Sequence, residues 1–408
     1  MTAVGADTAL SPLRHKSFRL LASARTIDYL GNGMAPIALS FAVLDRTGSV
    51  TDLGLVVGAR SVANVLLLLI GGVLADRFPR AVVLQGSATL AAVSQAVVAA
   101  SVFGHFDSVA LLAALGVLNG AASAASLPAA AALTNQTVPA NLVRQANALA
   151  RMGVAASGIV GSSVGGVLVG TVGPGWALAT DAASFVLVAL LFSRLRIPDT
   201  NVRLRASMPH ELRVGWRTFV GNTWVWVIVL QFLVLNAVFN GGVVVLGPSI
   251  ADHTIGRTAW GLVLGAQTLG SLLGGLLAAH WQARRALFVG VAACAAEVLP
   301  LLALGYLPRI AVLVGAMLVT GFLLAQFGVA WAVALQRNIP EDKLARVYSY
   351  DALGSFLAIP IGQVIAGPAA LAIGVRPTLA IGAGLIFVAT AVALAVPSVR
   401  RLELSDRR

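Results

Sequence analysis

Four carboxyl groups lie inside long apolar stretches of this chain, at Asp28, Asp181, Glu297 and Asp351. An ionised acid at the centre of a lipid bilayer costs about 2.5–3.5 kcal/mol on insertion scales, so an acid kept there is a functional candidate. A carboxyl in dry surroundings can take up and release a proton as those surroundings change. The chemistry that these residues predict is reversible protonation.

The depth of the four acids within their stretches separates them. At about 1.5 Å per helical residue, Asp28 lies about 15 Å beyond Phe18, near the middle of a bilayer, and Glu297 reaches a similar depth. Asp181 and Asp351 sit close to the ends of their stretches, where we expect them to be hydrated more easily. Asp28 and Glu297 are therefore the predicted midplane acids.

Asp28 has neighbours that could tune a bound proton. On a helix, Arg25 and Asn32 fall at positions i−3 and i+4 and share its face, and Arg60 of the next stretch could reach the same place. We expect Asp28 to carry the proton, with Arg25 or Arg60 adjusting its affinity. The alternative is a permanent Arg25–Asp28 pair that only neutralises buried charge.

Glu297 is kept in the predicted proton-coupling set with Asp28, Arg25 and Arg60, although a structural role is favoured for it. Glu297 could be protonated, or it could face a neighbouring helix through the gap that Pro300, three residues later, makes in the helical hydrogen bonding.

The elements that must hold these acids are long and apolar. Hydrophobic residues make up 58% of the 408 residues and charged residues 11%, against about 25% charged in a soluble domain. Apolar stretches of about 20 residues can cross about 30 Å of hydrocarbon as helices. The sequence predicts twelve such spans, at residues 18–44, 53–75, 81–103, 108–132, 145–170, 174–194, 224–249, 258–280, 286–305, 309–334, 347–371 and 377–397.

Two segments of the first half recur in the second. GLVVGARS at residues 54–61 returns as GLVLGAQT at 261–268, and GGVLA at 71–75 returns as GGLLA at 274–278. Repeated helical halves that enclose a central path are a transporter design. The predicted domains are a six-helix bundle at 1–194, a cytoplasmic linker with an amphipathic helix at 195–222, and a second six-helix bundle at 223–408.

The net charge of +12 is distributed unevenly. Most lysines and arginines fall in the N-terminus, alternate connections, the linker and the C-terminus, and only Arg46, Arg257, Arg309 and Arg376 lie in the opposite set of connections. This asymmetry follows the positive-inside rule and predicts cytoplasmic termini. Topology and contact with anionic membrane lipids explain the basic charge, so we expect no nucleic-acid partner.

Other classes of chemistry have no sequence signal. The single Cys294 and the five scattered histidines lack metal-ligand spacing, no nucleophile–base pair is recognisable, and no G-x-x-x-x-G-K-[ST] phosphate loop occurs. We expect no enzyme activity, no metal and no cofactor. If the chain pumps a solute, an ion gradient or a separate subunit must drive it.

The connection between the second and third predicted spans carries Gly72, Asp76, Arg77 and Arg80. An acid and two arginines at a helix end can pair with each other and with helix termini, and so latch one conformation. Membrane anchoring alone would explain the two arginines but not the glycine and the acid. The pattern resembles the G-x-x-x-D-R-x-x-R motif of the major facilitator superfamily.

Further segments resemble one branch of that superfamily, the drug/proton antiporters, which include macrolide efflux pumps and the enterobactin exporter. The resemblance runs from about Leu13 to Val396 and implies proton-coupled export without naming a substrate. The family often has Gly-Asp where this chain has Gly31-Asn32, a departure that removes one carboxylate. The segments that carry the resemblance are QANAL at 145–149, DAASF at 181–185 and ELRVGW at 211–216.

The fifth span contains Gly161, Ser162, Gly165 and Gly166, which resemble the antiporter motif G-P-x-x-G-G with serine in the proline position. Glycines one turn apart let helices approach closely and move against each other. The alternative is ordinary glycine packing.

The family architecture implies that spans one, four, seven and ten line a cavity, which favours Asp28 over Glu297. Mostly apolar walls with a few amides suit a bulky, amphipathic solute. For each residue the alternative is a hydrogen bond between helices. The predicted substrate path consists of Asn32, Asn119, Gln231, Asn236, Asn240, Phe322 and Gln326.

The predicted fold is all-α and integral to the membrane, with twelve transmembrane helices in two homologous six-helix bundles of the major facilitator type. The predicted function is proton-coupled export of hydrophobic or amphipathic small molecules, such as drugs, antibiotics, siderophores or secondary metabolites, by alternating access. We expect a monomer in the inner (cytoplasmic) membrane. Two alternatives stay open: uptake or facilitated diffusion without proton antiport, and a non-transporting sensor or accessory subunit.

Overall fold

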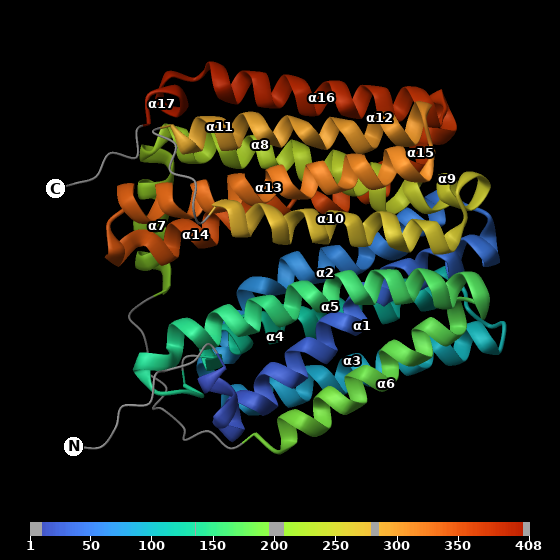
Figure 1. Cartoon of the computed structure of the whole chain (residues 1–408), viewed down its shortest axis with the longest axis horizontal. Coiled ribbons are helices and arrows are strands. Elements are labelled where there is room, and N and C mark those ends of the chain that lie inside the picture. The colour runs from blue at the N-terminus through green and yellow to red at the C-terminus, as the bar shows by residue number, and fades with distance from the viewer. Residues whose placement is uncertain (1–9, 135, 196–207, 279–284, 403–408) are drawn as a thin grey trace. The chain divides into compact units, whose positions relative to one another are not determined.

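The computed structural model consists of helices joined by short connections (Figure 1). It describes the backbone of residues 10–134, 136–195, 208–278 and 285–402, and within these the side chains of all but residues 68–77, 128, 131–132, 208–214, 341–342 and 345. In this described part, helices are the only regular elements, and twelve helical segments are long and apolar enough to cross a membrane. The predicted all-α membrane fold is confirmed.

The first six spans are single helices, whereas several spans of the second half are built from two or three segments. The first half contains η1 (Ser11–Arg14), α1 (Lys16–Thr47), α2 (Val50–Arg77), α3 (Arg80–Phe103), α4 (Val109–Thr134), η2 (Ala140–Leu142), α5 (Val143–Thr171) and α6 (Pro174–Ser193). The second half contains α7 (Met208–Gly221), α8 (Thr223–Phe239), the π-helix η3 (Asn240–Leu246), α9 (Gly247–Thr254), α10 (Arg257–Ala278), α11 (Ala286–Ala293), the 3-10 helix η4 (Cys294–Glu297), α12 (Val298–Tyr306), α13 (Ile310–Asn338), α14 (Glu341–Phe356), α15 (Ile359–Ile373), α16 (Val375–Ala395) and α17 (Pro397–Arg400).

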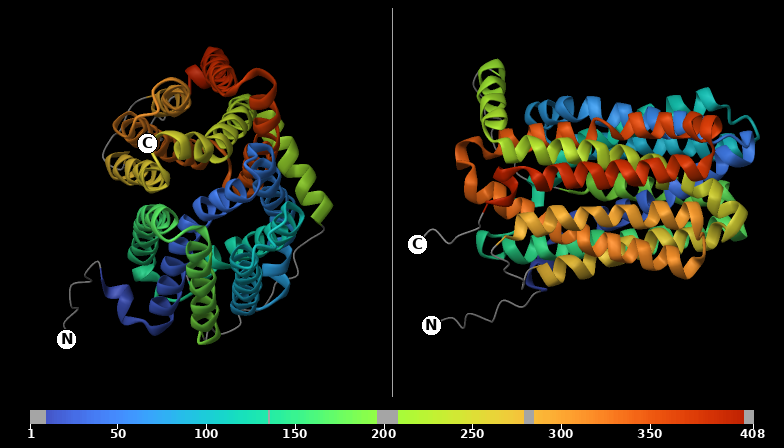
Figure 2. Two further views of the ribbon diagram at one scale, coloured as in Figure 1. Left: turned by 90° about the vertical axis from the view of Figure 1, so that its right-hand side faces the viewer. Right: turned by 90° about the horizontal axis from the view of Figure 1, so that it is seen from above.

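The chain divides into two compact units, each a bundle of helices when viewed end-on (Figure 2). The first unit comprises Met1–Arg46 and Ala59–Arg203, and the second comprises Thr47–Gly58 and Leu204–Arg408. The division passes through α2, whose first turns group with the second unit. The sequence-predicted domain limits, at residues 194 and 223, stay a prediction.

The internal repeat is visible in the turn that precedes the last long helix of each half, α6 in the first and α16 in the second. Gly173 joins α5 to α6 with a φ of 95°, and Gly374 joins α15 to α16 with a φ of 91°. These values lie in the left-handed region that glycine enters without a steric penalty. Each glycine therefore reverses the chain between two antiparallel helices at equivalent points of the two bundles.

The core of the first unit lies where α1, α3, α4 and α6 meet. Lipid tails are as apolar as leucine, so these helices are held by close packing rather than by the removal of apolar surface from water. The buried side chains of this core are Leu21, Ala24, Val83, Leu84, Ala88, Ala129, Leu133, Val188, Phe192 and Leu195.

In the second unit, α10 and α13 approach each other almost backbone to backbone. A Cβ on Gly270 would lie 2.9 Å from the carbonyl carbon of Leu318, and one on Gly321 would lie 3.0 Å from the backbone nitrogen of Ser271. Side chains at these positions would force the helices apart. The α10–α13 pair is thus set by glycine, as is common in membrane bundles.

The helix in the linker, α7, packs against α14 of the same unit and runs across the direction of the spanning helices (Figure 1). Trp216 stacks on Phe219 at 5.8 Å between ring centroids, and both rings contact Tyr350 of α14. A helix therefore lies within the predicted linker, with Phe219 buried against α14 and Trp216 about half exposed. Its place at the cytoplasmic membrane surface stays a prediction.

We expect Gly215→Leu to displace α7 from α14. A Cβ on Gly215 would lie 2.9 Å from the Cβ of Arg346 and 3.1 Å from Cε2 of Tyr350, so a leucine does not fit. Limited proteolysis should then cleave the linker faster than in the wild type. Gly221→Leu, on the same helix but with no atom within 4 Å of the new Cβ, is the matched control. Equal cleavage of both variants would contradict this packing.

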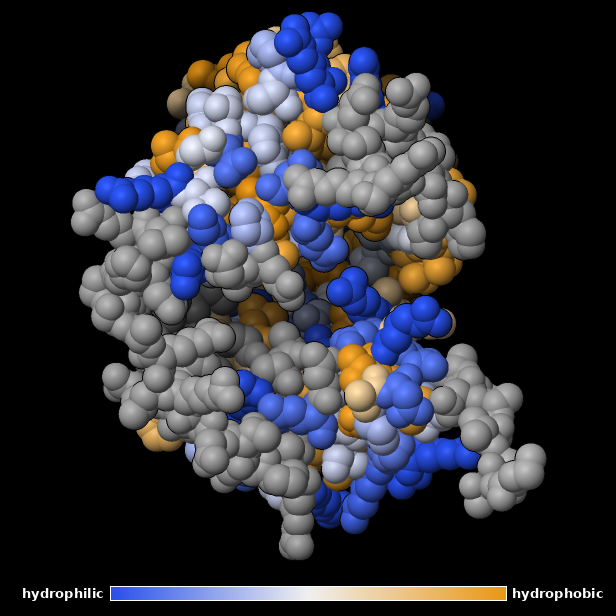
Figure 3. Space-filling view, turned by 90° about the vertical axis from the view of Figure 1, so that its left-hand side faces the viewer, coloured by the Kyte–Doolittle hydropathy of each residue, from blue (hydrophilic) through white to orange (hydrophobic). Residues whose placement is uncertain are grey.

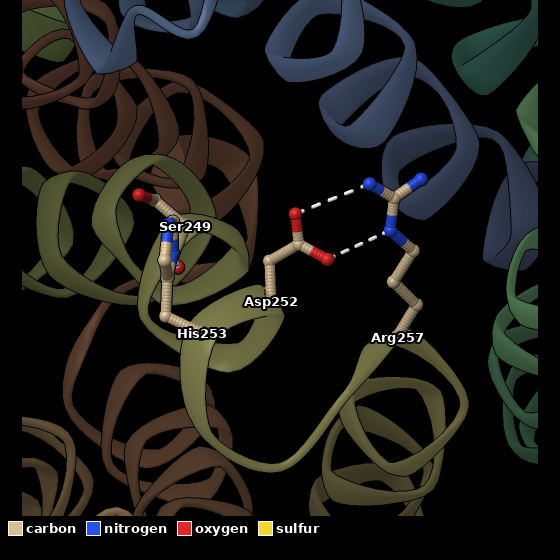
Figure 4. A network of polar contacts seen from close by, with 4 residues as sticks. All are labelled: Ser249, Asp252, His253 and Arg257. Carbon is tan, nitrogen blue, oxygen red and sulfur yellow. Dashed lines mark hydrogen bonds and ion pairs between the residues drawn. The ribbon is translucent and has the colours of Figure 1, made fainter.

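The two ends of the second unit differ in their polar groups. Hydrophilic side chains gather at the end where α7, α14 and α17 lie (Figure 3), and Arg337, Arg346 and Arg400 belong to these helices or to the adjoining end of α13. At the other end of α10, Arg257 binds Asp252 of α9 through Nε and Nη2, at 2.8 and 3.1 Å (Figure 4). This two-point ion pair closes the α9–α10 turn.

Candidate proton and solute site

A cavity of about 250 Å³ lies inside the first unit, between α1, α3, α4 and α6. Four predicted residues line it together: Arg25, Asp28 and Asn32 from α1, and Asn119 from α4. Its other walls are mostly alanine, leucine and phenylalanine side chains, with Tyr29 and three serines. Pockets for drug-sized ligands usually measure about 300–1,000 Å³, so in this conformation the cavity suits water or part of a solute.

Asp28, Asn32 and Arg60 form a chain of hydrogen bonds at this cavity. Asn32 Nδ2 donates to Asp28 Oδ1 at 3.2 Å and to the Asp28 carbonyl oxygen at 2.9 Å. Arg60 Nη2 of α2 donates to Asn32 Oδ1 at 3.2 Å. Asn32 therefore connects the acid to the arginine, as expected from its i+4 position.

Arg25 lines the same cavity and acts on Asp28 through space. In the described part of the chain no ion pair joins Arg25 to Asp28. The permanent Arg25–Asp28 pair that the sequence left open is therefore not formed in this conformation, and both residues line the cavity.

Asp181 corrects one sequence-based expectation. Its position near a span end suggested easy hydration, but the residue is 0% exposed on α6, and neither carboxyl oxygen has a hydrogen-bond partner. The reason is orientation: the side chain points toward α1, where Gly31 leaves space, and away from water. A Cβ on Gly31 would overlap Oδ1 of Asp181.

The predicted latch lies only partly within the described side chains. The backbone of Gly72, Asp76 and Arg77 belongs to α2, but their side chains are outside the described residues. Arg80 is the first residue of α3 and is half-buried. The latch stays a prediction.

The glycine motif of α5 lies against α1. A Cβ on Gly161 would overlap the carbonyl oxygen of Leu30, and one on Gly165 would lie 2.8 Å from Cα of Met34. Ser162 is buried and donates its hydroxyl hydrogen bond to the Gly158 carbonyl at 2.9 Å, within its own helix. Gly166 is also buried. The motif places α5 in close contact with the helix that carries Asp28 and Asn32.

The path residues predicted in the second unit bond to neighbouring helices. Gln231 Nε2 donates to Thr390 Oγ1 of α16 at 3.1 Å, Asn236 Nδ2 to the Ser355 carbonyl of α14 at 3.0 Å, and Gln326 Nε2 to the Gly274 carbonyl of α10 at 2.7 Å. These are hydrogen bonds between helices, which the sequence left open as the alternative to a role in the substrate path. Phe322 is half-buried on α13. A role in a solute path stays a prediction for all of them.

Asn240 begins the π-helix η3, and its amide donates to the Asn236 carbonyl at 2.9 Å. Gly241 and Gly242 of η3 line a second cavity, of about 270 Å³, together with residues of α12, α15 and α16. Thr378 is the one residue with a polar side chain in its lining. None of the predicted path residues lines this apolar cavity.

Glu297 ends the 3-10 helix η4, is 5% exposed and has Oε2 without a hydrogen-bond partner. Pro300 has no N–H to donate to the carbonyl of Ala296, four residues earlier. The hydroxyl of Thr320 on α13 fills that place and donates to the Ala296 carbonyl at 2.9 Å. The proline gap thus joins η4 to α13, and Glu297 lies beside that junction.

Sequence reasoning missed an aromatic stack in the second unit. Phe327 of α13 stacks on Phe232 of α8 at 4.5 Å and on Trp331 at 6.0 Å between ring centroids. Trp331 Nε1 donates to Asp351 Oδ2 of α14 at 2.9 Å, so this half-buried acid has a partner. The i,i+4 spacing of Phe327 and Trp331 places both rings on one face of a helix and could have indicated the stack. It does not identify the helix that contributes the third ring.

Comparison with known proteins identifies the family. The family model of the Major Facilitator Superfamily matches residues 21–362. This chain belongs to that superfamily. Its fold and relatives are those of membrane transporters and not of enzymes, as the loop motif led us to expect.

Curated relatives of this major facilitator protein are exporters. The multidrug efflux pump Tap of Mycolicibacterium fortuitum is 28% identical over 400 residues, which cover 92% of this chain and 95% of that protein. The enterobactin exporter EntS of Shigella flexneri is 25% identical over 393 residues, which cover 95% and 93%. The resemblance stated from the motifs is confirmed by these two relatives.

Solved structures agree on the fold. The nucleoside transporter NupG superimposes with a TM-score of 0.75 at 14% identity, covering 95% of this chain and 99% of that one. The xylose transporter XylE from E. coli gives 0.68 at 13% identity, with 96% and 98% covered. At these identities the likeness establishes the major facilitator fold and carries no information on the substrate.

Proposed function

We propose that this major facilitator protein is a proton-coupled exporter of hydrophobic or amphipathic small molecules, working by alternating access. The observation that carries the proposal is the Asp28–Asn32–Arg60 chain at a cavity with otherwise largely apolar walls. A carboxyl next to a cavity can exchange a proton with water that enters it. The names of the relatives Tap and EntS support export and an amphipathic solute class that includes drugs and siderophores.

In this proposal Asp28 exchanges the proton, and the charges of Arg25 and Arg60 adjust its affinity. Proton binding must favour one of two conformations for coupling to occur, and solute binding must respond to the same change. Asp76, Arg77 and Arg80 would bias that equilibrium, and the α1–α5 contact at Gly161 and Gly165 would transmit it, because α1 carries the proton site.

The proposed setting is the cytoplasmic membrane of a bacterial cell, with both termini in the cytoplasm. The charge asymmetry of the connections supports this orientation. The chain would act as a monomer, with anionic lipids around its basic end. The solute path would include the amides of both halves, from Asn32 and Asn119 to Gln231, Asn236, Asn240 and Gln326, with Phe322.

A susceptibility panel tests the direction of transport. Cells with and without the gene are exposed to ethidium, erythromycin and enterobactin, and the inhibitory concentration or internal accumulation of each is measured. Export predicts lower accumulation and higher resistance in cells with the gene. Sensitisation would establish uptake in its place, and no change with any compound of this class would favour a sensor or accessory subunit.

A further inference from the structure

Asp181 is a buried carboxyl in the first unit that the proposed Asp28 chemistry does not use. It is 0% exposed, and both of its oxygens lack a hydrogen-bond partner. Ser184, one turn away on α6, donates its hydroxyl to the Asp181 backbone carbonyl oxygen at 2.7 Å. An ionised carboxylate left this way inside a membrane bundle would be strongly unfavourable. The geometry is that of a neutral, protonated acid.

The carboxyl of Asp181 faces the same turn of α1 that holds Asp28 and Asn32. A Cβ on Gly31 would overlap both Oδ1 of Asp181 and Oγ of Ser184, so glycine at this position makes room for the acid. Gly31 lies between the two polar residues along α1. The cavity begins one turn from Asp181, since Phe185 at i+4 lines it.

Arg60 is the cation that the two acids share. It interacts electrostatically with both Asp181 and Asp28, and the two acids interact with each other. In this conformation a guanidinium nitrogen of Arg60 is bound to Asn32, on the side of Asp28. Arg60 already acts on Asp181 through space, but makes no hydrogen bond to it. A shift of Arg60 toward Asp181 would add that hydrogen-bonded ion pair and would allow Asp181 to release its proton.

Other charged groups lie away from Asp181. On α1 the remaining charge at the cavity is Arg25. Helices α3 and α5 pack against α6, but their charged residues lie at the ends of these helices that are distant from Asp181. Arg80 is the first residue of α3, whereas the last residue of that helix, Phe103, contacts Trp176 near the start of α6. Arg144 and Arg151 lie in the first third of α5. The α4 sequence contains no charged residue. Arg60 is therefore the basic group placed to respond to Asp181.

We propose that Asp181 is a second proton-binding residue. As the protein changes conformation, Arg60 would move between Asp28 and Asp181 and pair with each in turn. The inference rests on the proposed proton coupling and deepens it. The acid that pairs with Arg60 would release its proton, and the acid that Arg60 leaves would take one up. A structural role makes a different prediction, because a permanently protonated Asp181 never titrates.

The test reads protons directly and needs no transported solute. The purified full-length protein in vesicles of phosphatidylethanolamine and phosphatidylglycerol is titrated from acid to alkaline pH, and infrared difference spectra record the C=O stretch of protonated carboxyl groups. We expect the wild type to show a protonated-carboxyl band that disappears on alkalinisation and is missing in Asp181→Asn. Asp107→Asn, a change at another buried acid, which has Arg46 as its ion-pair partner, should retain the band.

Two results would overturn the inference: an Asp181 band that persists at every pH, or a spectrum that is the same in wild type and Asp181→Asn. If Asp181→Asn does not fold, Arg60→Gln provides the second variant. It should change the pH at which both the Asp28 and the Asp181 bands disappear. A change in the Asp28 band alone would also overturn the claim that the two acids share Arg60. Failure of the proposed function would look different. In that case the wild type would move no protons when solute is added, while its carboxyl bands would still titrate.

Discussion

Asp28→Asn is expected to abolish proton-driven export while leaving the protein folded. Asparagine has nearly the same shape, and its amide oxygen can still accept the hydrogen bond that Asn32 Nδ2 donates at 3.2 Å. It has no titratable proton, so solute export can no longer be driven by a proton gradient. Efflux of preloaded ethidium should fall to the level of cells without the gene.

The dependence on external pH separates loss of coupling from loss of folding. In the wild type, export should increase as the outside is made more acidic than the cytoplasm, because protons then enter down their gradient. In Asp28→Asn the response should be flat, while exchange of labelled for unlabelled solute persists. Asp252→Asn is the control, since that acid lies in a partly exposed ion pair, a kind worth about 0.2–1 kcal/mol. Normal pH response in Asp28→Asn would remove this acid from the mechanism.

Gly161→Val is expected to have the largest effect on stability. Even a methyl group at this position would overlap the Leu30 carbonyl oxygen and lie 3.2 Å from the Leu30 Cα, so α1 and α5 must separate. Overfilling a packed interior typically costs about 1–3 kcal/mol, and backbone atoms cannot rotate away as a side chain can. We expect a lower melting temperature in detergent and loss of export.

Gly86→Val is the matched control for this prediction. Gly86 lies on α3, and no atom stands within 4 Å of a Cβ built there. The same substitution should therefore leave the melting temperature and export close to wild type. A Gly161→Val protein as stable and active as Gly86→Val would show that the close α1–α5 contact is not needed.

The spans were predictable from the sequence because their length and polarity are dictated by the bilayer. The second predicted span, 53–75, corresponds to α2 at Val50–Arg77, and the sixth, 174–194, to α6 at Pro174–Ser193. The clustering of Arg25, Asp28 and Asn32 was also accessible, since one helix with 3.6 residues per turn places them on one face. Hydropathy and periodicity are local, and they predict local features well.

The remaining features depend on which helix faces which. Depth along α6 suggested that Asp181 is hydrated, but its orientation toward Gly31 of α1 buries it. Asp351 receives its hydrogen bond from Trp331, twenty residues earlier and on another helix. The π-helix at Asn240–Leu246 and the 3-10 helix at Cys294–Glu297 are changes of hydrogen-bond register within apolar sequence. A single sequence contains no pattern that pairs distant helices in these ways.

The most direct test of the central claim is solute-induced proton movement. Purified wild-type protein and Asp28→Asn are reconstituted into proteoliposomes that contain a pH-sensitive dye, and ethidium, erythromycin and enterobactin are added in turn. We predict that at least one compound moves protons across the wild-type membrane and that this flux disappears in Asp28→Asn. Solute transport by the wild type with no proton movement would contradict antiport and leave facilitated diffusion, with Asp28 as a buried structural charge.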